Sequence, residues 1–199
     1  MSTIDTSRVA AVFVGAASRH KPVRTTLPRA QALRTELRPD LLLGAVAIPE
    51  RHTTHGDEHL RMLSKQDRGC AFFVSQVVYD AGAAKSMLSD YFYTCAERGV
   101  APRPVIFTLS VCGSLKTLAF LNWLGVDVPR WLQNTLRHAE DPLHESYSQC
   151  LANAQDLIAF CRRLGTPFGF NIESVSIRRT EIESSVALAA ELSDLLKGR

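Results

Sequence analysis

Five short apolar runs, separated by segments of helical periodicity, constrain the fold of this chain more than any other feature. The runs are Arg8 to Gly15, Leu41 to Ile48, Ala71 to Val78, Val105 to Leu109 and Phe168 to Ser174. The run from Ala71 to Val78 is so apolar that a strand here needs cover on both faces, which is typical of parallel strands in α/β folds. Strands that alternate with helices along the whole chain predict a parallel sheet with right-handed crossovers.

Helix start and stop signals fill the segments between these runs. We expect helices from Pro28 to near Pro39, from about Asp57 to Arg68, from an Asp80 cap to near Gly99, from Ser114 to Leu124, through Trp131 to His138, from Glu145 to Leu164, and from a Thr180–Glu183 capping box to Leu196. Five strands are too few for a closed eight-stranded barrel. The pattern alone therefore leaves two architectures open, a doubly wound open sheet and an incomplete (β/α)8 barrel.

Composition indicates an ordinary globular protein. The 199 residues suffice for a single domain, and 46% of them are apolar and 22% charged. No apolar run is long enough to cross a bilayer and the N-terminus lacks a secretion signal, so we expect a cytoplasmic protein without a membrane partner. Five scattered cysteines predict buried free thiols, and a net charge of +3 does not favour nucleic acid.

Polar side chains follow the predicted strands, and the carboxyl ends of parallel strands share one edge of a sheet. They are Glu50, His52, Gln76, Tyr79, Ser110, Asn171 and Glu173. Gln76 is either a ligand contact or a satisfied buried amide. Glu173 is a candidate acid if burial raises its pKa, and a salt bridge to Arg178 is the alternative.

Other constellations are less specific. There is no glycine-rich phosphate loop, which disfavours a dinucleotide fold of the Rossmann kind. His52, His55 and His59 lie close in sequence, but they lack the His-Glu-x-x-His order and Gly56 indicates a turn, so we predict no metal site.

Two groups of charged residues could meet an anionic ligand. The loop from Ala16 to Thr26 carries Arg19, His20, Lys21 and Arg24, and it is otherwise a solvated loop. Glu58, Arg61 and Lys65 share one helix face, where they form either a solvated stripe or a binding surface.

Several motifs in order resemble the methylenetetrahydrofolate reductase family. They are Pro49-Glu50-Arg51-His52, Lys65, Gly69, Ser75-Gln76-Val77-Val78-Tyr79-Asp80, Arg103-Pro104-Val105-Ile106, Leu115-Lys116 to Phe120, and Gly125-Val126-Asp127-Val128-Pro129-Arg130-Trp131. Each motif is weak alone, and their order and spacing together are fairly specific. The similarity covers nearly all the chain from Val9.

The resemblance implies a (β/α)8 barrel fold and an oxidoreductase of one-carbon metabolism and methionine biosynthesis. It implies hydride transfer from NADH or NADPH to 5,10-methylenetetrahydrofolate, giving 5-methyltetrahydrofolate, commonly through FAD. By position, Gln76, Phe120 and Tyr79 would contact the folate substrate. Glu50, His52, Glu58, Arg61 and Lys65 would contact the cofactor, and Glu173 is the candidate acid.

The sequence also departs from that family. Gly15-Ala16 stands where flavin-using members have Gly-Asp, and Val14 and Ile48 replace their arginine and tyrosine. These changes resemble a divergent actinobacterial branch thought to transfer hydride directly from NADH. The family's first three strands and their catalytic glutamate have no counterpart in residues 1–199. We therefore expect a partial barrel of about five parallel strands, either completed by a second chain or copy, or an inactive folate- or nucleotide-binding subunit.

Overall fold

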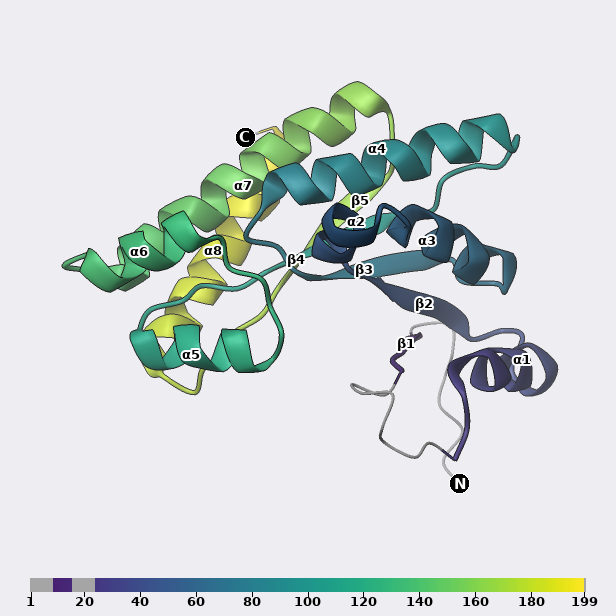
Figure 1. The fold of residues 1–199 in the computed structure, drawn as a ribbon, viewed down its shortest axis with the longest axis horizontal. Helices are drawn as coiled ribbons and strands as arrows, with labels where there is room; N and C mark the ends of the chain where they lie inside the picture. Colours follow the sequence, from purple (N-terminus) through teal and green to yellow (C-terminus); the bar gives the residue numbers. More distant parts are fainter. Residues whose placement is uncertain (1–8, 16–23, 199) are drawn as a thin grey trace.

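The strand order separates the two candidate architectures. The computed structural model describes residues 9–15 and 24–198, and its strands are β1 (Ala10–Phe13), β2 (Leu42–Ala47), β3 (Phe72–Val77), β4 (Val105–Leu109) and β5 (Phe168–Ile172). They form one sheet in the order β1-β2-β3-β4-β5, with every neighbouring pair parallel (Figure 1). A doubly wound sheet reverses its strand order at a switch point, whereas a barrel adds each strand beside the previous one. The prediction of five parallel strands with flanking helices in a barrel-type order is confirmed.

The helices follow the predicted segments with three differences. They are α1 (Leu27–Leu37), α2 (Pro49–His55), α3 (Glu58–Asp67), α4 (Ala81–Glu97), α5 (Leu115–Trp123), α6 (Arg130–His138), α7 (Pro142–Leu164) and α8 (Arg179–Lys197). Helix α2 was not predicted, because a proline after an apolar run is typical of a strand end, although Pro49 also suits the first turn of a helix.

Capping explains the other two differences. Helix α7 begins before Glu145, because the Asp141 carboxylate accepts hydrogen bonds from the first-turn amides of Leu143 and His144 at 3.0 and 3.1 Å. The predicted capping box at Thr180 is wrong, since Arg178 is the N-cap of α8 and Thr180 lies inside the helix. The Asp80 cap is confirmed.

The two faces of the sheet differ in burial. Ala45, Phe73 and Val105 stand side by side in register, and all three are fully buried in the core. Helices α4 and α7 lie next to each other on one side of the sheet (Figure 1). The opposite row, Val46 and Val74 with Ile106, is only half-buried. In a closed barrel this second face would be the interior, and here it is accessible.

Two further features concern the core and the membrane. All five cysteines are buried and free, as predicted. Among the helices of residues 24–198, none combines the length and the apolar character that crossing a bilayer requires.

The exposed edge of the sheet predicts self-association. Strand β1 is an edge strand, and Val12 on it is 36% exposed on the accessible face. Unpaired strand edges with apolar side chains pair with other chains. Sedimentation velocity of the wild-type chain should therefore show a dimer or larger species. Val12→Lys should shift it to monomer, whereas Val186→Lys, on the exposed face of α8, should not. A wild-type chain that stays monomeric would contradict this prediction.

Candidate functional site

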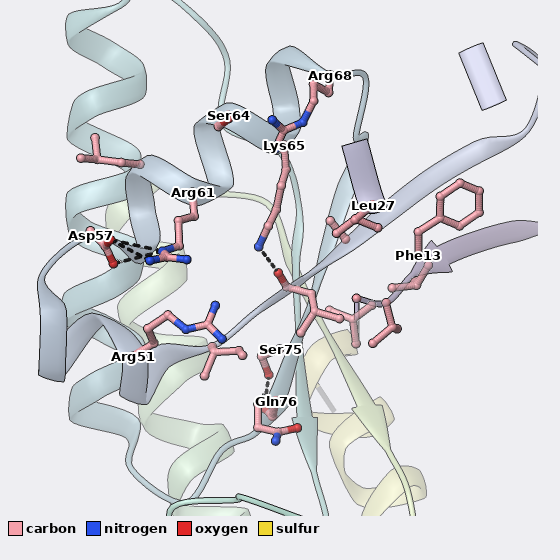
Figure 2. A pocket seen from close by; sticks show the side chains of 18 of the residues that line it. Phe13, Leu27, Arg51, Asp57, Arg61, Ser64, Lys65, Arg68, Ser75 and Gln76 are labelled. Atoms are coloured by element: carbon pink, nitrogen blue, oxygen red, sulfur yellow. Dashed lines mark hydrogen bonds and ion pairs between the residues drawn. The ribbon is translucent and has the colours of Figure 1, made fainter. Parts of the chain in front are cut away.

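A cavity of about 1060 Å³ lies against the accessible face of the sheet (Figure 2). Its apolar wall comes from Val12 and Phe13 of β1, Val46 of β2 and Val74 of β3. Leu124 and Gly125, which follow α5, also line it. This volume is at the upper end of the range of ligand pockets, about 300–1,000 Å³. The cavity can therefore hold a large ligand or two smaller ones.

Gln76 contributes the amide of this cavity. It lies at the carboxyl end of β3, where the pairing between β3 and β4 shifts register between Val74 and Val77. Such an irregularity redirects a side chain, which is why bulges occur next to binding sites. Within residues 9–15 and 24–198, no group forms a hydrogen bond with the side-chain amide of Gln76. Gln76 thus presents a free donor and a free acceptor to a ligand.

Ser75 has a structural role beside it. The Ser75 hydroxyl donates to the carbonyl of Gln76 at 2.7 Å and accepts from the backbone amide of Thr108 at 2.9 Å. The Thr108 hydroxyl in turn donates to the carbonyl of Ser75 at 2.9 Å. These bonds fix β3 to β4 at the point where the regular ladder is interrupted.

Four basic side chains form the opposite wall of the cavity. Arg51 comes from α2, Arg61 and Lys65 from α3, and Arg68 from the turn after α3 (Figure 2). Asp57, which also lines the cavity, holds Arg61 through hydrogen bonds of 3.1 and 3.2 Å. A wall with more cations than anions favours a ligand with carboxylate or phosphate groups.

Glu58 organises this wall although it does not line the cavity. Its carboxylate is fully buried and accepts from the backbone amide of Ile48 at 3.2 Å and from Arg51 at 3.1 Å. Lys65 lies 3.4 Å from the same carboxylate and donates to the carbonyl of Val46 at 2.6 Å. Burial lowers the pKa of Lys65, and the charge of Glu58 opposes that shift. The alternative of a solvated stripe is therefore wrong for Glu58.

The structure places two predicted substrate residues away from the cavity. Tyr79 is buried in the core, where its hydroxyl donates to the carbonyl of Ser110 at 2.7 Å and burial raises its pKa. Phe120 is 41% exposed on α5 and stacks on Trp123 with ring centroids 5.6 Å apart. Neither side chain lines the cavity, because Tyr79 points into the helical layer and Phe120 into solvent.

The structure does not support Glu173 as the candidate acid. Glu173 is exposed and accepts a hydrogen bond of 3.3 Å from Asn171, so the burial that we expected for it is absent. The alternative partner Arg178 instead lies 3.7 Å from Glu181. A second carboxyl with buried oxygens at this edge of the sheet belongs to Glu50. Its two oxygens have no hydrogen-bond partner among the described residues, and Glu50 does not line the cavity. Burial raises its pKa to about 7, with smaller contributions from the charges of Asp127 and Asp80.

His52 lies apart from the cavity as well. Its ring is buried between helices and its Nε2 atom is 3.0 Å from the Asp90 carboxylate.

The predicted basic loop, from Ala16 to Thr26, falls mostly on residues 16–23, which lie outside the described residues. Val14 and Ile48, which replace an arginine and a tyrosine of flavin-using reductases, both line the cavity.

Part of the cavity was not predicted from the sequence. The cavity is also lined by Val12, Phe13, Arg51 and Arg68, none of which was a predicted site residue. Arg51 belongs to a motif that was recognised, but its neighbours Glu50 and His52 were chosen instead. Arg51 could have been predicted if Pro49 had been taken as the start of helix α2. The first turns of that helix lie close to the charged face of α3.

The fold and the cavity define an α/β protein with a barrel-type parallel sheet and a pocket on the accessible face of that sheet, which would be the inner face of a closed barrel. No family model and no curated protein matches the chain. A solved structure from Clostridium thermocellum, of a protein described as binding two copies of 5-methyl-5,6,7,8-tetrahydrofolic acid, is 48% identical with a TM-score of 0.88. The match covers 95% of this chain and 65% of that chain, so this chain spans less than two thirds of the length of the protein it resembles.

The pKa of Glu50 predicts how stability depends on pH. A carboxyl with a folded pKa of about 7 and an ordinary value of 4.5 binds more protons when folded, so its contribution to stability is lost as pH rises through this window. Glu50→Gln should remove that loss. The unfolding free energy of the variant relative to wild type should rise by about 1–3 kcal/mol between about pH 4.5 and about pH 8. Urea denaturation at several pH values measures this difference in unfolding free energy. Glu97→Gln, on the exposed side of α4, is the control. Equal pH dependence of Glu50→Gln and wild type would refute the raised pKa of Glu50.

Proposed function

We propose that this chain is a folate-binding domain whose ligand lies in the cavity between the inner face of the sheet and the basic wall of α2 and α3. The observation that carries the proposal is the arrangement of the cavity, with apolar side chains and a free amide at one wall and cations at the other. A reduced folate has matching parts: a flat pterin with adjacent donors and acceptors, and a glutamate tail with carboxylates. The ligand of the Clostridium thermocellum protein supports the same class.

Gln76 would recognise the pterin. An amide donates and accepts at once, which matches the alternating donors and acceptors along the edge of a pterin ring. Val74 and Val12 would cover the ring faces, and both line the same cavity as Gln76. The glutamate tail would then lie along Arg61 and Arg68, where charge-assisted hydrogen bonds are strongest. The cavity volume also supports a folate together with a second ligand.

A second candidate function is reduction of 5,10-methylenetetrahydrofolate, in keeping with the resemblance to the reductases. Glu50 favours it, because a carboxyl with a pKa of about 7 can give up a proton near neutral pH. In the overall reaction a hydride adds to the methylene carbon, the carbon–N10 bond breaks, and N10 takes up one proton. NADH or NADPH would supply the hydride when bound, and the same basic wall fits the phosphates of such a cofactor. Glu50 would supply the proton, in place of Glu173. Because Glu50 does not line the cavity, a bridging water would have to carry this proton to the substrate.

The partner of the domain is also a proposal. The accessible sheet face and the edge of β1 favour a second chain or a second copy that covers the cavity. An inactive domain that only binds folate remains the alternative to the reductase. Folate binding is common to both.

Gln76→Ala should weaken binding of 5-methyltetrahydrofolate by about 1–3 kcal/mol, because the variant leaves pterin donors and acceptors without partners. Isothermal titration calorimetry of the wild type and the variant measures this change. Gln155→Ala serves as control, since Gln155 is exposed on α7 and distant in sequence from the cavity residues. Equal affinity of wild type and Gln76→Ala, or no binding by the wild type, would contradict the proposed site.

The reductase proposal has its own test. The purified chain should oxidise NADH or NADPH only when methylenetetrahydrofolate is present, and the preparation should be colourless if hydride passes without FAD. Glu50→Gln should lower turnover by about 10²- to 10⁴-fold with unchanged folate affinity, as expected for loss of a general acid. Folate binding without any oxidation of NADH or NADPH would leave the binding domain as the function and exclude the reductase.

A further inference from the structure

A second cluster of polar side chains lies outside the cavity, between three helices. His52 comes from α2, His59 from α3 and Asp90 from α4. One ligand-type atom from each residue lies within 4.8 Å of those from the other two. None of the three side chains lines the cavity, so the folate proposal does not account for them.

The contacts within the cluster leave two buried imidazole nitrogens without a hydrogen-bond partner among the described residues. His52 Nε2 lies 3.0 Å from an Asp90 carboxylate oxygen, and the ring of His59 meets the ring of His52 edge-on with centroids 5.2 Å apart. The Nδ1 atoms of both histidines are buried and have no hydrogen-bond partner among the described residues. An unpaired buried polar atom costs free energy, so a further ligand at this place would be stabilising.

We propose that His52, His59 and Asp90 bind a divalent transition-metal ion, with zinc as the ion that the ligand set fits best. Two imidazoles and one carboxylate form a known type of zinc site, with a water in the fourth position. Bonds of about 2.1 Å in a tetrahedron place ligand atoms about 3.4 Å apart, which small rotations of these side chains reach from the present distances. Asp90 is more than half exposed, so the ion and its water can enter from solvent.

The metal would join the helices that carry the basic wall of the cavity. Arg51 lies next to His52 on α2, and Arg61 lies two residues after His59 on α3. Fixing α2 and α3 to α4 would hold these cations in place before a ligand arrives, which lowers the entropic cost of binding. The metal is thus structural in this proposal and takes no part in chemistry on the folate.

The test uses the full chain after treatment with EDTA, with Co²⁺ and Zn²⁺ as probes. One equivalent of Co²⁺ should give the visible absorption bands of a four-coordinate ion, and Zn²⁺ should displace it. Excess Zn²⁺ should raise the melting temperature by roughly a few degrees, because an ion that binds only the folded state stabilises it. Binding should weaken as the pH falls, since imidazole must be neutral to bind a metal.

Matched variants localise the site. Asp90→Asn and His59→Gln should each weaken Co²⁺ binding by about tenfold or more, since each removes a ligand. His55→Gln should bind as the wild type does, because His55 is exposed on the same helix as His52 and lies outside the cluster. Circular dichroism checks that the variants fold, and exposure of Asp90 makes that substitution mild. Absence of the bands in the wild type, their persistence in both ligand variants, or their loss in His55→Gln would overturn the proposal.

Discussion

The proposed site depends on the open inner face of the parallel sheet. Five strands added in sequential order bury one face beneath helices and leave the row of Val46, Val74 and Ile106 half-accessible. The carboxyl ends of parallel strands meet at one edge, so the same order brings Gln76 and Glu50 to that edge. The apolar wall, the amide and the candidate acid therefore follow from topology together with the spacing of a few residues.

Burial of Glu58 gives this surface its charge. A fully buried carboxylate is tolerated only when hydrogen bonds and opposite charges compensate its lost hydration. Glu58 receives both from Ile48, Arg51 and Lys65, and these contacts connect the end of β2 with α2 and α3. The cations are thereby positioned at the cavity wall. Removal of the Glu58 carboxylate would leave Arg51 and Lys65 without the partner that orders them. The stability of this region and its capacity to bind an anion therefore depend on the same residue.

Much of the fold could be predicted from local signals, and much of the site could not. Apolar runs predict all five strands. Asp80 was predicted as a helix cap and Ser114 as a helix start, and both side chains accept hydrogen bonds from backbone amides within three residues. Helix α2 was missed because Pro49 suits both a strand end and a first helical turn. Gln76 lines the cavity, since its position at a strand end fixes its location, and its contact with a substrate stays a prediction.

Burial of single polar side chains was beyond prediction. Glu173 and Glu50 both follow strands, yet only contacts from distant segments decide that the carboxyl oxygens of Glu50 are buried and that Glu173 is exposed. Tyr79 lies in the core because Ser110, 31 residues later, accepts its hydrogen bond. The cluster of His52 with Asp90 joins residues 38 apart, so no sequence motif contains it.

The central claim is that the Gln76 amide contacts the bound pterin, and side-chain amide NMR tests it most directly. The two resonances of the Gln76 amide are assigned by their absence in Gln76→Ala, and 5-methyltetrahydrofolate is then added to saturation. The account predicts a large shift of the Gln76 signals with little change at Gln155. Saturable binding of the folate that leaves the Gln76 resonances in place would contradict it.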